Sequence, residues 1–299
     1  MRIRKSPAKQ KKYHQVSRSS PNSKIFNLTR AMPINSNRFR IPIITTIVAG
    51  IVALLIKYFV FSLQPQGFIN SFANHAGVFF FCYLLTAEIL PEYPTLQTIS
   101  GAVATLLTII YGTGDVILIF WLLMILRLLN RSSGLTATMF DHLLIISLTY
   151  WIAKPGYWLY PAITAFIFFL ESKLPYGNSR SLYSAGFAFL LIISIPAIEK
   201  PPSDIPIDWF ILMVVTTLLY TSVVKQTDLT KMLDEHSNKP LNPLHLQSAQ
   251  IIILIISFIC AWYYGNVVMQ SFLPIWAVML STGLYTSSKF ISQKLNKQP

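Results

Sequence analysis

Charge and cysteine are both scarce in this sequence. Only 12% of its 299 residues are Asp, Glu, Lys or Arg, whereas 53% are hydrophobic. That balance lies outside the range of soluble globular domains and is typical of chains whose solvent is a lipid bilayer. The two cysteines, Cys82 and Cys260, lie in apolar runs without a C-x-x-C partner or a histidine cluster. We therefore interpret both as buried small side chains.

The short motifs that mark several enzyme classes are also missing. The sequence contains no G-x-x-x-x-G-K-[ST], no G-x-G-x-x-G, no H-E-x-x-H and no G-x-S-x-G. It has no Asp-rich pair of the kind that holds Mg²⁺ for prenyl or phosphatidyl transfer. These absences disfavour a primary pump and a lipid transferase. We expect no cofactor, no metal site and no catalytic residue set.

Acidic residues are absent from the first 87 positions. Residues 1–40 hold eleven of the 24 Lys and Arg, which leaves thirteen basic and eleven acidic residues for the rest of the chain. The formal charge of +13 therefore belongs to one tail. We expect residues 1–40 to be a disordered cytoplasmic tail that touches anionic lipid headgroups, with no nucleic-acid partner. An organelle transit peptide and an RNA-binding arm are the alternatives.

Apolar runs of span length recur from residue 41 onward and predict an all-α, polytopic membrane bundle of about ten helices, with eight as the lower bound. We place eight helices in 41–224, a cytoplasmic loop at 225–245, two helices in 246–288 and a cytoplasmic tail at 289–299. The third to sixth runs are short, so a re-entrant pair over 95–129 is an alternative. The individual spans are 42–63, 72–90, 95–112, 114–129, 137–153, 156–172, 181–198, 206–224, 246–264 and 266–287.

The orientation follows from the positions of Lys and Arg in the loops, because cytoplasmic loops carry an excess of both. With the N-terminus inside, the inner loops and the C-terminal tail hold ten basic residues, and the outer loops hold only Lys154 and Lys200. Aromatic residues such as Trp158, Trp209 and Tyr263 fall at the expected outer ends, where indole and phenol rings are enriched. Both termini are therefore expected in the cytoplasm, and a bacterial inner membrane is preferred over an organelle membrane.

Ionisable residues within the apolar runs are functional candidates, since charge is costly in a bilayer. If the runs cross the membrane in alternating directions, six of these ionisable residues lie near the cytoplasmic face. We call this group the inner polar layer. It could form a polar cavity with Arg127 and Arg131 as anion binders and His142 as a proton handler. The interpretation that we prefer is structural, with Arg127 paired to Asp141 across the short turn 130–136, because all these groups lie within reach of the interface. Its members are Glu88, Arg127, Arg131, Asp141, His142 and Glu171.

A second, sparser group is expected near the opposite face, and we call it the outer polar set. It consists of Lys57, His75 and Asp115. Lys57 either extends its amine to the interface or pairs with Asp115. His75 is a lone imidazole, for which we expect no metal.

Three functions remain open at this stage. Transport of a small molecule or ion is preferred, although only 12 glycines argue against closely packed moving helices. A non-catalytic subunit or assembly factor with membrane-protein partners needs only an apolar bundle and a basic tail. A membrane enzyme acting on a lipid-linked substrate through Asp141 and His142 is the third alternative.

Overall fold

The computed structural model describes residues 26–28, 37–62, 64–112, 114–175, 177–196, 205–225 and 241–295. Within these ranges the regular structure is eleven α-helices and one 3-10 turn, without a strand. The expected all-helical class is confirmed there. Five helices are long and apolar enough to cross a membrane, which supports a membrane location. They are α1 (Asn37–Phe61), α2 (Phe68–Ile89), α3 (Pro94–Tyr111), α8 (Ile207–Lys225) and α9 (Pro243–Tyr264).

Four consecutive helices in the middle of the chain are shorter. They have 15 or 16 residues each, so each is about 22 to 24 Å long, against about 30 Å for the hydrocarbon core of a bilayer. A helical membrane bundle is thus supported, and the count of about ten spans stays a prediction. The four helices are α4 (Val116–Asn130), α5 (Met139–Ala153), α6 (Leu159–Lys173) and α7 (Ser179–Ser194).

The last expected span, 266–287, is broken into two helices. The short α10 (Asn266–Ser271) ends before Phe272, and α11 (Leu273–Leu295) follows. Pro274 explains the break, because proline has no N–H to continue the ladder of α10 but is tolerated in the first turn of a new helix. α11 also continues through most of the 289–299 segment, where we had expected a tail.

The tail and the long loop fall mostly outside the described residues. Of the expected disordered tail, residues 37–40 form the first turn of α1, and residues 26–28 pack against the bundle. Both observations differ from the expectation of disorder. Of the expected loop 225–245, Lys225 ends α8 and residues 243–245 open α9.

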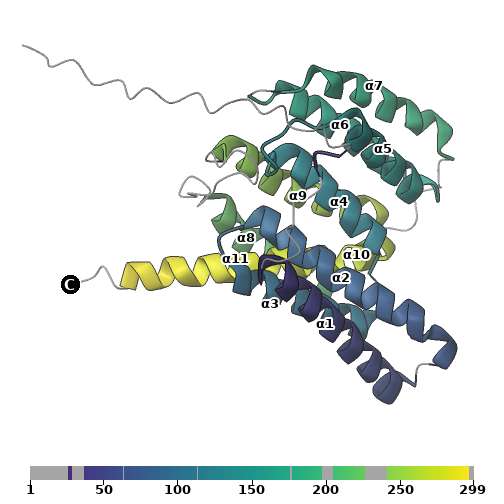
Figure 1. Ribbon diagram of the computed structural model, residues 1–299, viewed down its shortest axis with the longest axis vertical. Coiled ribbons are helices and arrows are strands. Elements are labelled where there is room, and N and C mark those ends of the chain that lie inside the picture. The colour runs from purple at the N-terminus through teal and green to yellow at the C-terminus, as the bar shows by residue number, and fades with distance from the viewer. Residues whose placement is uncertain are drawn as a thin grey trace, which may run out of the picture.

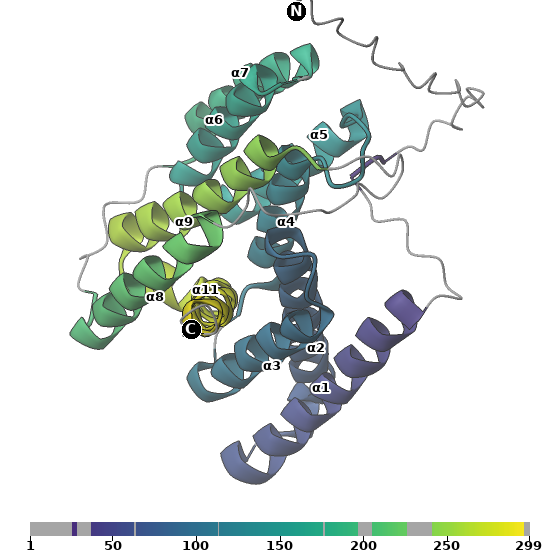
Figure 2. The same cartoon turned by 90° about the vertical axis from the view of Figure 1, so that its left-hand side faces the viewer.

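The helices form a broad bundle in which chain neighbours usually pack together (Figure 1). α5, α6 and α7 lie at one end, α4 and α9 are central, and α1, α2 and α3 lie at the other end. The view turned by 90° shows α11 end-on between α8 and α3, which are its two main neighbours (Figure 2). Fully buried aromatic side chains, among them Trp121, Phe168 and Trp276, fill the interior.

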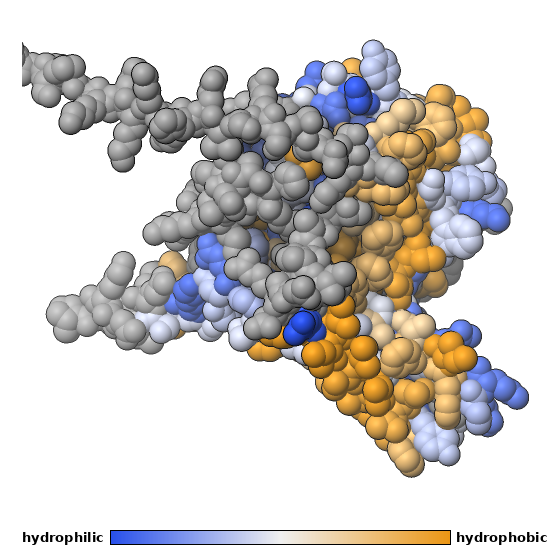
Figure 3. Space-filling view, in the orientation of Figure 1, coloured by the Kyte–Doolittle hydropathy of each residue, from blue (hydrophilic) through white to orange (hydrophobic). Residues whose placement is uncertain are grey.

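α1 lies at the periphery and exposes an apolar face. Val48, Phe59 and Val60 are among its exposed side chains, and the lower part of Figure 3 shows this surface as predominantly hydrophobic. Such a face is stable against acyl chains, since large exposed apolar patches are uncommon on soluble monomers. The exposure therefore agrees with a lipid environment for α1.

Candidate functional site

The inner polar layer contains a buried ion pair between the ends of α2 and α4. Arg127 Nη1 lies 2.7 Å from Glu88 Oε1, and both side chains are 3% exposed. Asn130 adds a second contact, because its Nδ2 donates to the Glu88 carbonyl at 2.8 Å and to Oε2 at 3.3 Å. The Glu88 carboxylate therefore has both a cation and an amide as partners, as a buried charge requires.

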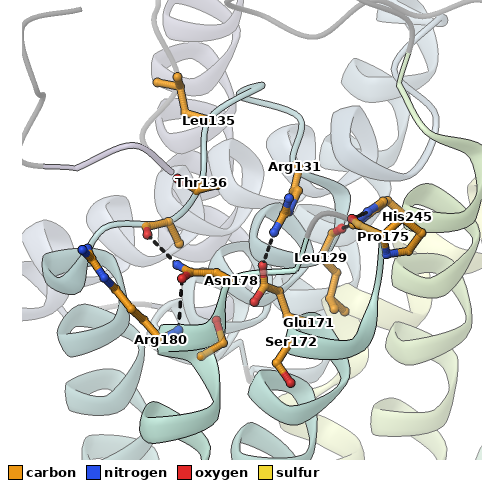
Figure 4. Close-up of polar contacts among 12 residues, drawn as sticks. Leu129, Arg131, Leu135, Thr136, Glu171, Ser172, Pro175, Asn178, Arg180 and His245 are labelled. Atoms are coloured by element: carbon orange, nitrogen blue, oxygen red, sulfur yellow. Dashed lines mark hydrogen bonds and ion pairs between the residues drawn. The ribbon is translucent and has the colours of Figure 1, made fainter.

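A second ion pair joins the turn after α4 to the end of α6 (Figure 4). Arg131 Nη2 donates to Glu171 Oε1 at 2.6 Å, and the Glu171 side chain is 1% exposed. Arg131 caps the C-terminus of α4 with a left-handed backbone, φ 52° and ψ 35°. This conformation is uncommon for a residue with a Cβ and is usually taken by glycine. The ion pair is thus built on a strained position.

Four buried polar atoms in this region have no hydrogen-bond partner in the described part of the chain. They are Asn130 Oδ1, Arg131 Nε, Ser132 Oγ and Glu171 Oε2. Because buried polar groups are usually satisfied by protein or by ordered water, these atoms mark the least satisfied part of the inner polar layer.

Asp141 has a different role from the one that we expected. The sequence favoured Asp141 as the ion partner of Arg127, and this expectation is corrected because the carboxylate that pairs with Arg127 is that of Glu88. Asp141 forms a capping box with Thr138 at the start of α5. It also accepts hydrogen bonds from the backbone N–H groups of Asn27 at 3.0 Å and Leu28 at 3.3 Å.

His142 is enclosed rather than open. Its Nδ1 lies 2.9 Å from the Ser184 hydroxyl, and its Nε2 lies 3.4 Å from the Ser181 hydroxyl. The ring packs edge-on against Phe168, with centroids 5.0 Å apart, and the residue is 3% exposed. His142 therefore links α5 to α7 and α6.

His245 belongs to the same region, but the sequence analysis placed it at the end of a loop. Its Nδ1 lies 2.7 Å from the Leu129 carbonyl and its Nε2 lies 2.9 Å from the Pro175 carbonyl (Figure 4). It thereby joins the start of α9 to the ends of α4 and α6. The only signal in the sequence that His245 lies in a helix was its position two residues after Pro243, because proline is common in the first turn of a helix.

The outer polar set is not assembled into a comparable cluster. Asp115 caps α4, accepting hydrogen bonds from the N–H groups of Ile117 at 2.9 Å and Leu118 at 3.1 Å. His75 is buried, and its Nδ1 lies 2.6 Å from the Ser71 carbonyl in the preceding turn of α2. Lys57 is half-buried on α1. Asp115 thus caps its own helix, whereas a pair with Lys57 was one of our two alternatives from the sequence.

The opposite side of the bundle is aromatic, as the spans predict. Trp158 Nε1 donates to the Tyr263 hydroxyl at 3.2 Å, and the rings of Tyr111 and Trp209 lie 5.1 Å apart. A mainly apolar cavity of about 320 Å³ lies on this side. It is lined by Ile205, Ile207, Phe210 and Trp262. Among the described residues, no three His, Cys, Asp or Glu side chains group so that they could hold a metal ion.

Comparison with protein-family models gives no match, and comparison with curated proteins and with solved structures gives none either.

Proposed function

We propose that this protein is a non-catalytic component of a membrane assembly, a helical scaffold that holds its partners within the bilayer. The observation that carries the proposal is the internal pairing of the inner polar layer. Glu88 pairs with Arg127, and Arg131 with Glu171. Asp141 is occupied by a helix cap and by the backbone of residues 27 and 28.

Such pairing favours a structural role for physical reasons. A group that binds a solute or transfers a proton must exchange one partner for another during its cycle. Breaking a buried ion pair by removing one partner costs about 3 to 5 kcal/mol. The Glu88 carboxylate, which has two amino-acid partners and is 3% exposed, is therefore better suited to holding α2 against α4 than to exchanging ligands.

The geometry of His142 favours the same conclusion over a membrane enzyme. A general base must come within hydrogen-bond reach of its substrate. Both ring nitrogens of His142 instead lie near serine hydroxyls of α7, and its ring faces Phe168. These contacts support a packing role at the junction of three helices.

Transport of a small solute or ion is the second candidate, and one observation favours it. The unpartnered atoms of Asn130, Arg131 and Glu171 provide acceptors and a donor in one region. Water or a small ion passing among them would complete their hydrogen bonds. This candidate places the working groups around Glu171, away from the Glu88–Arg127 pair.

The proposal extends to location and lipid contact. We infer a bacterial inner membrane, with the inner polar layer on the cytoplasmic side and the basic residues 1–40 against anionic lipid headgroups. The support is the bias of Lys and Arg toward the inner loops, because each basic residue near an anionic surface contributes about 1 kcal/mol.

Exchanging the buried charges distinguishes the two candidates. In the double variant Glu88→Arg with Arg127→Glu, the ion pair is kept but its polarity is reversed. A scaffold should recover most of the thermal stability that either single variant loses, and it should still complement growth of a deletion strain. Recovery of folding without recovery of complementation would contradict the scaffold proposal.

Native mass measurement provides the second test. The full chain is extracted with its surrounding lipid in polymer-bounded nanodiscs, without detergent exchange. A scaffold should be part of an assembly heavier than the 33.9 kDa chain, with another membrane protein in fixed stoichiometry. A chain that is alone in its nanodiscs and shows proton or solute flux in liposomes would support transport instead. Glu171→Gln is the matched variant that should then abolish flux.

A further inference from the structure

Residues 26–28 form a short segment, bent at Asn27 and Leu28, whose backbone is hydrogen-bonded to Asp141 near the start of α5 and to Arg127 near the end of α4. Asp141 accepts from the N–H groups of Asn27 and Leu28, at 3.0 and 3.3 Å. Arg127 Nε donates to the carbonyl of Leu28. An acid and a base thus bind the N–H and the C=O of the same residue, so Leu28 lies between two fixed charges of opposite sign.

The side chains of the segment are recognised as well. Leu28 is 2% exposed and belongs to the hydrophobic core of the bundle. The Asn27 amide donates to the Thr136 carbonyl at 2.9 Å. The ring of Phe26 packs edge-on against Phe140, with centroids 6.1 Å apart. In peptide recognition, backbone hydrogen bonds provide affinity and pockets for side chains provide specificity. The segment 26–28 makes both kinds of contact.

The receptor groups are held in place by contacts outside the segment. Glu88 pairs with Arg127, and the Thr138 backbone N–H donates to the Asp141 carboxylate at 2.8 Å. Groups that are fixed in advance lose less conformational entropy when a ligand arrives. The site is therefore a preorganised one rather than two charges that the segment itself orders.

We propose that Arg127, Asp141 and Thr136 form a peptide-binding site, and that residues 26–28 occupy it in cis. Its ligand class is a short peptide with an Asn followed by an aliphatic residue that becomes buried. Only the eight positions 29–36 separate the occupant from α1, and a short tether gives an effective concentration in the millimolar range. The cis segment is thus retained strongly but is exchangeable. This proposal does not depend on the scaffold role.

Cutting the tether in the complete, folded chain tests the proposal. A protease recognition sequence is introduced within residues 29–36, and the purified protein is cleaved in a neutral detergent. We expect the N-terminal fragment to stay with the bundle in gel filtration. A synthetic peptide with the sequence of residues 22–32 should then displace it in a saturable manner. Loss of the fragment immediately after cleavage, from a bundle whose thermal unfolding is unchanged, would overturn the proposal.

Peptide and protein variants separate recognition from the general attraction of a basic tail. Replacing Leu28 or Asn27 by Ala in the peptide keeps its charge, and each change should weaken displacement about tenfold or more, as expected for losing a buried side chain or a hydrogen bond. In the protein, Asp141→Asn should release the fragment faster. Asp115→Asn, the matched helix cap of the outer polar set, should not. Equal displacement by all peptides would contradict a specific site.

Discussion

The inner polar layer and the outer polar set contain the same kinds of side chain but use them over different distances along the chain. Arg127 reaches Glu88 across 39 positions, and Arg131 reaches Glu171 across 40. In the outer polar set, Asp115 binds N–H groups two and three residues ahead, and His75 contacts a carbonyl four residues back. One group joins helices to each other, whereas the other completes single helices.

This difference predicts unequal costs for equivalent substitutions. Removing one charge of the inner polar layer leaves a buried partner without compensation, whereas removing an outer group exposes one helix end or loses one local hydrogen bond. The variants below compare the two groups, from the largest expected effect to the smallest.

Arg127→Met is expected to have the largest effect. It leaves the Glu88 carboxylate buried without its cation, so the free energy of unfolding should fall by about 3 to 5 kcal/mol. Thermal or denaturant unfolding in detergent would measure the loss. Adding Glu88→Gln to Arg127→Met should recover part of the stability. The outer cation provides the control, because Lys57→Met should change stability by no more than about 0.5 kcal/mol. Equal losses for the two cations would remove the distinction between the groups.

Two acidic caps allow a closer comparison. Asp115→Ala should cost about 1 kcal/mol, the usual cost of losing a cap. Asp141→Ala loses a capping box and the two hydrogen bonds to residues 27 and 28, so we expect about 2 to 3 kcal/mol. Chemical denaturation of both variants in the same detergent would test the order. If Asp115 proves the more costly of the two, the segment 26–28 contributes little to the stability of the bundle.

Arg131 combines a favourable ion pair with an unfavourable backbone conformation. Arg131→Asn loses the contact with Glu171 but tolerates a positive φ, while Arg131→Gly also relieves the strain. We therefore expect Arg131→Gly to be more stable than Arg131→Ala by about 1 kcal/mol. In a Glu171→Gln background, where no ion pair can form, Arg131→Gly should match or exceed the stability of its parent. A lower stability in that background would show that the arginine side chain contributes through other contacts.

His142→Gln is expected to have the smallest effect within the inner polar layer. A glutamine amide can keep one hydrogen bond to Ser181 or Ser184, so the loss should be about 1 kcal/mol. Imidazole is the side chain whose unperturbed pKa lies closest to neutrality, so a proton-handling role for His142 requires the variant to flatten the pH dependence of function. We expect growth complementation between about pH 6 and pH 8 to be unchanged. A flattened profile would reassign His142 to transport.

Helix positions could be predicted from the sequence far better than contacts between helices. The nine helices α1 to α9 correspond one by one to the first nine apolar runs, because apolar length and boundary residues such as Pro94, Asp115 and Asn178 act locally. The prediction of a single helix over the tenth run was wrong. The run is apolar throughout, but Pro274 interrupts its backbone hydrogen bonding. That proline is visible in the sequence and was the signal for the break.

The membership of the inner polar layer was partly predictable, but its pairing was not. If successive spans alternate in direction, Glu88, Arg127 and Glu171 lie near the same face of the membrane, regardless of which helices pack together. Which carboxylate each arginine reaches depends on which helices pack side by side. Because α4 packs beside α2, Arg127 pairs with Glu88 and not with Asp141, although Asp141 is closer to Arg127 along the chain. His245 was missed because nothing in the sequence around a polar residue at the end of a loop indicates that its side chain is buried.

The sequence by itself determined the helical class and the apolar length of the long helices, because each depends on residues within a few turns of one another. The tertiary structure alone decided that Arg127 pairs with Glu88, that His245 joins three helix ends and that Leu28 enters the core. The reason is physical: a buried charge or amide needs a partner, but many partners are equally compatible with the sequence. Only the packing of apolar helix faces, which is non-directional, brings one of them within hydrogen-bond distance.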